Sequence, residues 1–229
     1  MSRGRRISRV KYIPPSQKVA AKYLREWENK TLFHFPEQFP KLTCSALFSQ
    51  TGLISLDIGC GTGEFTNAVA LQHPEEWFVG VEISRRSIYH AVNQAARRNI
   101  PNVLYIKTDF KLIDPLLEPN SLGTVYLNFP DPNYGGKNRQ KHRIFSNEFL
   151  SLMDGALSPS GTIQVVTDQK PFLLDMLEIA ESDPRFKKTH SERYLEEFSP
   201  PEKTRFQIAW EKFDRPVFRF ILKKAGTRS

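Results

Sequence analysis

Three glycines at alternate positions, Gly59, Gly61 and Gly63, follow a short apolar run that carries an acid near its end. The run 53–58 is typical of a buried strand, and a segment that can form a helix begins at Glu64. Glycines in such a strand–turn–helix let the backbone turn sharply and approach a ligand closely. The pattern predicts a turn that binds a nucleotide or a nucleoside. The alternative is a glycine-rich turn without a ligand.

The spacing of these residues argues against a dinucleotide as the ligand. A dinucleotide fingerprint reads G-x-G-x-x-G, whereas here Glu64 stands at the place of its third glycine. A carboxylate at a helix start disfavours a second anion there, because both would occupy the same partly positive helix end. An acidic strand end suits a cationic ligand instead, such as the amino group and sulfonium of S-adenosylmethionine. A dehydrogenase is therefore the least favoured class.

Five acids lie at or just after the C-terminal ends of predicted strands. Ligands of an open α/β sheet bind outside that edge, so the set predicts a nucleoside pocket. Glu82 lies 23 positions after Gly59, where a carboxylate can accept hydrogen bonds from both ribose hydroxyls. Asp109 could meet the adenine amino group. One acid alone would be interpreted as a helix cap or a solvated turn, so the prediction rests on the whole set: Asp57, Glu82, Asp109, Asp131 and Asp168.

The segment 128–132 follows the fourth predicted strand and reads Asn-Phe-Pro-Asp-Pro. Pro130 and Pro132 restrict φ on both sides of Asp131, so its carboxylate would be held rigidly at the sheet edge, as a catalytic group requires. A basic run follows directly, and we interpret it as a loop that grips phosphates. The alternative is a solvated charged loop. The cations of this run are Lys137, Arg139, Lys141 and Arg143, with His142 among them.

The elements that must position these residues alternate between strand and helix. Strands are expected at 53–58, 77–82, 103–107, 124–129, 162–167 and 217–222. Helices are expected at 17–30, 64–72, 84–98, 146–157 and 171–181, with a turn at 159–161. This alternation predicts an α/β fold in which helices cover both faces of a parallel sheet.

The length and charge bound the organisation of the protein. The chain has 229 residues and a formal net charge of +8, which favours a polyanionic partner, nucleic acid first. We expect a basic, disordered arm at 1–15 and a single domain at 16–229. Within that domain, 16–50 forms a helical part and 51–229 the catalytic sheet.

Other features concern the surroundings of the protein. Its two cysteines, Cys44 and Cys60, lack a metal-binding spacing, and we expect no metal and a reducing, cytoplasmic setting. No apolar run approaches the ~20 residues that cross a bilayer, so no membrane association is expected. The N-terminal segment has no apolar core typical of a secretory signal. Both a monomer and a homodimer remain open.

Taken together, these motifs resemble the tRNA (guanine-N7-)-methyltransferases of the bacterial single-chain type, over roughly residues 50 to 223. The Phe-Pro-Asp-Pro corner with its basic run is the most specific part. The glycine motif by itself resembles only the first motif of class I methyltransferases. The matching segments are 56–63, 80–82, 129–132 with the run to Arg143, 167–168 and 202–207.

The resemblance implies a fold, a reaction and a set of site residues. The fold would be Rossmann-like, with a seven-stranded, mostly parallel sheet that contains one antiparallel strand. The reaction would transfer the methyl group of S-adenosylmethionine to N7 of a guanine in tRNA, in the variable loop. Asp131 would be catalytic. The methyl donor would be bound by Asp57, Gly59, Gly61, Glu82, Asp109 and Asp131, and the tRNA by Lys137, Asp168, Thr204, Arg205, Phe206 and Gln207.

The chain departs from the family pattern at three places. Asn133 replaces a tryptophan, and Gly135 and Gly136 precede the loop lysine, whose role we carry to Lys137. Gln207 replaces a glutamate and removes a charge. The alternatives are a class I methyltransferase that acts on another RNA, a protein or a small molecule, and an RNA-binding relative without catalysis. The basic run and the net charge favour RNA, and the complete set of acids favours catalysis.

Overall fold

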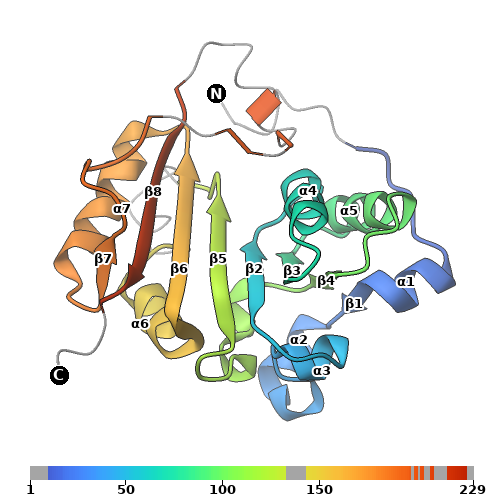
Figure 1. Cartoon of the computed structure of the whole chain (residues 1–229). Helices are drawn as coiled ribbons and strands as arrows, with labels where there is room; N and C mark the ends of the chain where they lie inside the picture. Colours follow the sequence, from blue (N-terminus) through green and yellow to red (C-terminus); the bar gives the residue numbers. More distant parts are fainter. Residues whose placement is uncertain are drawn as a thin grey trace.

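The centre of the protein is a single sheet. The structure, a computed structural model, describes residues 10–132, 143–196, 199–200, 202–203, 207–208 and 216–225. Within these residues, eight strands are paired in the order β1-β4-β3-β2-β5-β6-β8-β7 (Figure 1). The strands are β1 (Leu24–Glu26), β2 (Ile54–Ile58), β3 (Trp77–Glu82), β4 (Val103–Lys107), β5 (Leu122–Asn128), β6 (Leu157–Thr167), β7 (Phe186–Lys188) and β8 (Phe218–Lys224).

The sheet is parallel except at β8, which pairs antiparallel with β6 and β7. The prediction of a mostly parallel sheet with one antiparallel strand is therefore confirmed. The chain passes from β2 outward through β3 to β4, and then returns to place β5 on the other side of β2. Open sheets bind ligands at such a reversal of strand order, so the β2–β5 boundary is the position to inspect for a site.

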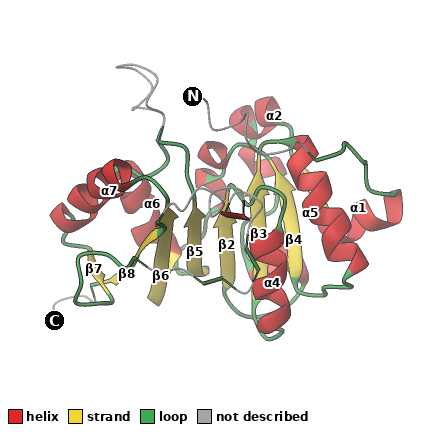
Figure 2. Cartoon of the chain, turned by 90° about the horizontal axis from the view of Figure 1, so that it is seen from above, coloured by secondary structure: helices red, strands yellow, loops and turns green. Residues whose placement is uncertain are grey.

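Helices cover both faces of the sheet (Figure 2). One core joins α2, α3, α6 and α7 to one face, and a second core joins α1, α4 and α5 to the other. Alternation along a strand divides the residues between them: Val79 belongs to the first core and Phe78 to the second. The helices are α1 (Gln17–Tyr23), α2 (Asn29–His34), η2 (Pro36–Gln38), α3 (Cys44–Phe48), α4 (Glu64–Gln72), α5 (Arg85–Arg97), η3 (Phe110–Leu112), η4 (Asp114–Leu116), α6 (Asn147–Ala156) and α7 (Lys170–Ser182).

The sheet has one strand more than expected, and a prediction near the N-terminus is wrong. The helix expected at 17–30 ends at Tyr23, and the chain continues as the edge strand β1, which pairs with β4. The Trp27 amide then donates to the Lys107 carbonyl at 3.1 Å, and the Trp27 side chain is buried. An open sheet edge and an apolar core thus outweigh local helix propensity here.

A second difference concerns the turn expected at 159–161. These residues lie inside β6, where the register with β5 shifts between the pairs Leu122↔Leu157 and Thr124↔Thr162. The predicted turn is therefore a local irregularity within a longer strand.

Residues 10–15, the described end of the expected arm, lie along α5. The Asn93 amide donates to the Ile13 carbonyl at 2.9 Å, and the Tyr12 and Tyr89 rings are 5.6 Å apart. A cavity of about 750 Å³ lies between this segment and α5. Residues 1–9 lie outside the described residues, so the division into arm and domain stays a prediction. Among the described helices, none has the length and apolar character needed to span a membrane.

Candidate active site at the carboxyl edge of the sheet

The glycine turn joins the end of β2 to the start of α4. Gly59, Gly61 and Gly63 all have positive φ, at 72°, 58° and 80°. A Cβ at Gly63 would lie 2.5 Å from the Cβ of Ala91, so this glycine lets α5 approach. A Cβ at Gly59 would meet no described residue within 4 Å. Gly63 therefore serves packing, whereas the space beside Gly59 is open for a ligand.

Helix α5 holds the glycine turn from behind. The Gln94 side chain donates to the Thr62 carbonyl at 3.1 Å, and the turn's Thr62 hydroxyl donates to the Glu64 carboxylate. Glu64 thus occupies the first turn of α4 as an anion-bearing residue that is itself buried. A pyrophosphate would meet this carboxylate at the helix start, which agrees with the exclusion of a dinucleotide.

Two acids flank the turn, Asp57 buried and Glu82 half-buried. Asp57 is 2% exposed, and one of its oxygens accepts from the Thr66 hydroxyl at 2.6 Å. The other, Oδ1, is buried without a hydrogen-bond partner among the described residues. Burial raises the pKa of Asp57 to about 7; the Thr66 bond opposes this rise, and the nearby charge of Glu82 adds to it. A cationic ligand would offset the cost of burying the Asp57 charge, and it would donate the hydrogen bond that Oδ1 lacks.

Glu82 ends β3 and is held by the backbone. Its two oxygens accept from the amides of Gly61, at 3.1 Å, and Ser84, at 2.7 Å. Burial raises the pKa of Glu82, and these amide hydrogen bonds act against that rise. Ile83, the next residue, is 57% exposed. A carboxylate and an apolar side chain therefore stand together at the rim, a pairing that the sequence analysis did not identify.

The third acid of the set, Asp109, follows β4. Its carboxylate accepts from the Lys111 amide at 3.0 Å and so caps the short helix η3. Asn29, at the start of α2, accepts from the Thr108 hydroxyl and the Asp109 amide, and ties this loop to the N-terminal part. The helix cap that the sequence analysis gave as the alternative for a single acid is therefore observed at Asp109.

The Asn-Phe-Pro-Asp-Pro corner follows β5. Phe129 has φ 52°, a backbone conformation that is strained for a bulky residue, and such strained residues cluster at functional sites. Its amide donates to the Val166 carbonyl at 2.7 Å, which fastens the corner to β6. Asp131, two residues further, is exposed. The corner and the glycine turn therefore follow β5 and β2, the strands on either side of the reversal of strand order.

Arg143, the last cation of the basic run, is an anchor. It donates to the Pro132 carbonyl at 2.8 Å and to Asp175 of α7 at 2.7 Å, and it lies over the Phe172 ring. Its side chain is only 12% exposed. The hypothesis that Arg143 grips phosphate is therefore not supported, because these contacts use the guanidinium to join Arg143 to Pro132 and α7. The rest of the run, with Lys137, lies outside the described residues.

Of the predicted tRNA-binding residues, the two that the structure describes are buried. Asp168 follows β6, is 6% exposed and accepts from the Gln169 side chain at 2.8 Å. Gln207 is 1% exposed. Thr204, Arg205 and Phe206 lie outside the described residues. The five acids of the set nevertheless lie at or just after the C-terminal ends of five neighbouring parallel strands, β4-β3-β2-β5-β6, and so they lie along one edge of the sheet.

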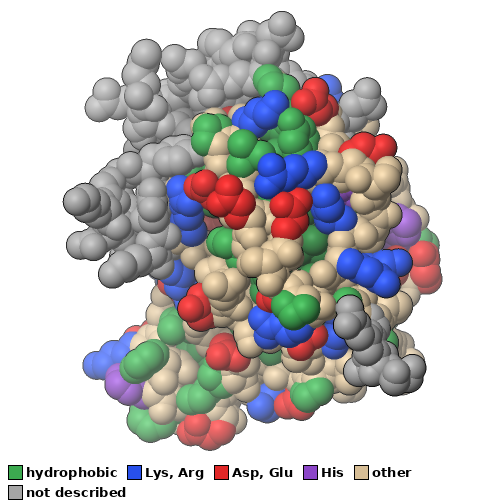
Figure 3. Space-filling model, turned by 90° about the vertical axis from the view of Figure 1, so that its left-hand side faces the viewer, with side chains coloured by type: hydrophobic (Ala, Val, Ile, Leu, Met, Phe, Trp, Pro, Cys, Tyr) green, Lys and Arg blue, Asp and Glu red, His purple; other side chains and the backbone are tan. Residues whose placement is uncertain are grey.

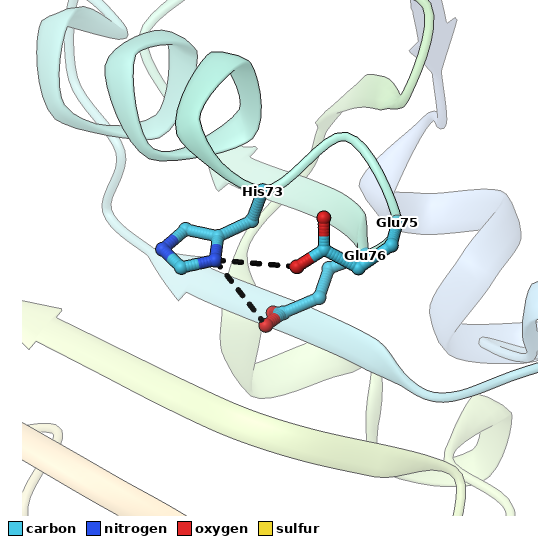
Figure 4. Close-up of side chains that lie close together, drawn as sticks. All are labelled: His73, Glu75 and Glu76. Carbon is cyan, nitrogen blue, oxygen red and sulfur yellow. Dashed lines mark ion pairs between the residues drawn. The ribbon is translucent and has the colours of Figure 1, made fainter.

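A separate group of titratable side chains lies between α4 and β3, at the opposite end of these elements. His73 Nδ1 lies 3.4 Å from Glu75 and 3.8 Å from Glu76 (Figure 4). The Ser55 hydroxyl also donates to Glu76 at 3.1 Å. These exposed ion pairs connect the helix to the strand and take no part in the edge described above.

Comparison with known proteins defines the class first. A family model described as "Putative methyltransferase" matches residues 51–220. The fold is that of solved methyltransferases: a 30S ribosomal A1408 methyltransferase from an uncultured bacterium has a TM-score of 0.55 at 17% identity, covering 77% of this chain and 89% of that one. The aminoglycoside resistance methyltransferase NpmB1 has a TM-score of 0.55 at 15% identity, covering 87% and 95%. The protein has the class I methyltransferase fold, as predicted.

Curated relatives then define the family. A tRNA (guanine-N(7)-)-methyltransferase of Rubrobacter xylanophilus is 39% identical over 218 residues, 95% of this chain and 97% of that protein. One of Chloroherpeton thalassium is 37% identical over 222 residues, 97% and 98%. The chain belongs to the tRNA (guanine-N(7)-)-methyltransferase family, which confirms the resemblance inferred from the sequence.

Proposed function

We infer that this protein transfers the methyl group of S-adenosylmethionine to N7 of a guanine in tRNA. The observation that carries the proposal is the open space at Gly59, between the acids of β2 and β3 and the strained corner after β5. We further propose that the guanine lies in the variable loop, as the family resemblance implies.

The methyl donor fits the residues around the glycine turn. The buried oxygen of Asp57 that has no partner among the described residues can accept from a cationic amino group, and Gly59 leaves room for the methyl donor beside the backbone of the turn, where Gly61 also lies. Glu82 is held by two amides, and its remaining lone pairs would accept from the ribose hydroxyls, while the exposed Ile83 offers an apolar surface to an adenine ring. Asp109 lies one strand further along and would face the adenine amino group.

S-adenosylmethionine, when bound, supplies a methyl group on a sulfonium, which the N7 lone pair displaces in line. That lone pair is free at neutral pH, so the protein needs no strong base, and its contribution is to position the two reactants. The methylated base gains a positive charge. Asp131, held by Pro130 and Pro132, would stabilise that charge or orient the base through its amino edge.

Recognition of tRNA is proposed for the basic run that starts beyond the corner. Figure 3 shows acids and cations interspersed on the face that includes α7, where Glu181 pairs with Lys188 and Arg193. A polyanion would find little surface of a single sign on this described face. Lys137, Thr204, Arg205 and Phe206 are proposed to contact the RNA. Because Asp168 and Gln207 are buried, we propose that they support those contacts from below.

The experiment is to incubate the protein with labelled S-adenosylmethionine and bulk tRNA, and to map the modified nucleoside in nuclease fragments by mass spectrometry. We expect 7-methylguanosine at one position in the variable loop. Label in protein or in another RNA would favour the broader methyltransferase reading. Tight tRNA binding without transfer would favour the RNA-binding relative.

A further inference from the structure

The side-chain amide of Asn128 has an unusual environment. Both its nitrogen and its oxygen are shielded from solvent, and neither has a hydrogen-bond partner among the described residues. Among the residues that the structure describes, Asn128 alone has two such side-chain atoms. An amide buried without partners costs free energy, and native proteins tolerate it mainly where a ligand or water completes the bonds. The sequence analysis assigned no role to this residue.

The strand register locates Asn128 beside the glycine turn. Tyr126 pairs with Asp57 of β2, so the position two residues further on β5 lies next to Gly59. Alternate residues of a strand share a face, and Tyr126 faces α4, where its ring lies 5.0 Å from that of Phe65. Asn128 therefore lies on the α4 face, between the open space at Gly59 and the corner that carries Asp131.

We propose that Asn128 binds both reactants and aligns them, its amide oxygen accepting from the amino group of the methyl donor and its amide nitrogen donating to guanine O6. This inference rests on the proposed function. An amide offers one acceptor and one donor group, and the two reactants need one of each. The donor's ammonium cannot accept, so it fixes the orientation of the amide. Guanine N7 stays free for methylation while its neighbour O6 is held.

The proposal also explains a preference for guanine. Guanine presents O6 as an acceptor next to N7, whereas adenine presents an amino group there. The ammonium fixes the amide so that its NH₂ group points toward the base. An adenine would then place its own amino group against that NH₂, and neither group can accept a hydrogen bond. Asn128 would thus contribute to base specificity as well as to alignment.

Three variants test the donor side of the proposal by calorimetry with S-adenosylhomocysteine, which retains the amino group. Asn128→Ala removes both contacts and is expected to weaken binding about tenfold. Asn128→Asp keeps the acceptor and is expected to bind at least as tightly as the unaltered protein. Gln72→Ala, an amide deletion at an exposed position at the far end of α4, is the matched control and should change nothing. Unchanged binding by Asn128→Ala would overturn the ammonium contact.

The guanine side is tested with a tRNA that carries 2-aminopurine, which lacks O6, at the modified position. The unaltered protein and Gln72→Ala should lose about 10- to 100-fold in kcat/KM on this tRNA. Asn128→Ala should lose nothing further, and Asn128→Asp should favour the 2-aminopurine substrate because its carboxylate repels O6. An equal loss in all four proteins would overturn the O6 contact.

These outcomes separate the inference from the proposed function. If the unaltered protein does not methylate guanine N7 at all, the proposed function fails before any variant is compared. If Asn128→Ala does not fold, the isosteric Asn128→Asp still tests both contacts through its binding affinity and its choice between the two tRNAs.

Discussion

Replacing Asp57 by asparagine is expected to stabilise the protein at neutral pH and, at the same time, to weaken its binding of the methyl donor. Asp57 is 2% exposed, one oxygen is bound by Thr66, and the other has no partner among the described residues. Burial therefore raises its pKa from 3.8 to about 7. An asparagine keeps the size of the side chain and an acceptor for Thr66, but it carries no charge to desolvate.

The magnitude follows from the two pKa values. Between 3.8 and about 7, the folded state holds a proton that the unfolded state has released, so stability falls as the pH rises. Each pH unit in that window costs about 1.4 kcal/mol. From about pH 5 to about pH 7, this carboxyl therefore lowers the free energy of unfolding by about 3 kcal/mol, and above that pH the loss is complete. Glu82, whose pKa is also raised, acts in the same direction in both proteins.

The assay is urea denaturation of the ligand-free protein and of Asp57→Asn across this pH range. The stability difference should grow by about 3 kcal/mol in favour of the variant, or about 6 to 12 °C in melting temperature. Glu178→Gln, an acid-to-amide change at an exposed position of α7, should show no such trend. A difference that does not change with pH would refute the reasoning, because an Asp57 that ionises at an ordinary pH would give that result.

The affinity for the methyl donor should change with pH in the opposite direction to the stability. A cation beside Asp57 favours the ionised form, so the affinity for S-adenosylhomocysteine should rise with pH up to about 7, up to about tenfold per unit. Asp57→Asn should bind more weakly and lose this dependence. A variant that retained the dependence would move the cation contact to another group.

Three further predictions follow from the turn, the corner and the basic run. Gly63→Ala should destabilise the fold more than Gly59→Ala, because only the Gly63 substitution would collide with Ala91; thermal melts would measure this difference. Gly59→Ala should instead block binding of the methyl donor, which calorimetry would measure. Asp131→Asn should lower kcat far more than donor affinity, and equal losses in single-turnover and binding assays would make Asp131 a pure donor-binding residue. Neutralising the first three cations of the basic run should reduce the salt dependence of tRNA binding by about one unit of slope per lost phosphate contact, and an unchanged slope would contradict the phosphate role. These cations are Lys137, Arg139 and Lys141.

The site could be predicted from the sequence in part, because one edge of a parallel sheet collects the ends of its strands. Once strands alternate with helices, an acid after each strand must lie on that edge, whatever the order of the strands. That is why the sequence alone groups Asp57, Glu82 and Asp131. Their roles remain predictions, since the grouping fixes position and not ligand.

Roles that depend on contacts between distant segments could not be predicted. In the sequence, Arg143 looks like a phosphate-binding residue of the basic run. Only its hydrogen bonds to Pro132 and Asp175 in the structure show that it is an anchor. Gly63 looks equivalent to Gly59 in sequence, yet Ala91 of α5 decides that it serves packing. No pattern in the sequence indicates that the amide of Asn128 has no hydrogen-bond partner among the described residues.

By itself, the sequence determined the local elements of the motif: β3 and α4 have the predicted bounds, and the glycine turn lies between α4 and β2. Hydrophobic periodicity, glycine and helix-start signals act between near neighbours in the chain, so they can be interpreted without coordinates. Only the tertiary structure decided that the helix at the N-terminus gives way to β1, which acids are buried, and which polar groups lack partners. Burial and pairing are set by segments far apart in the chain, and a carboxylate's pKa depends on both.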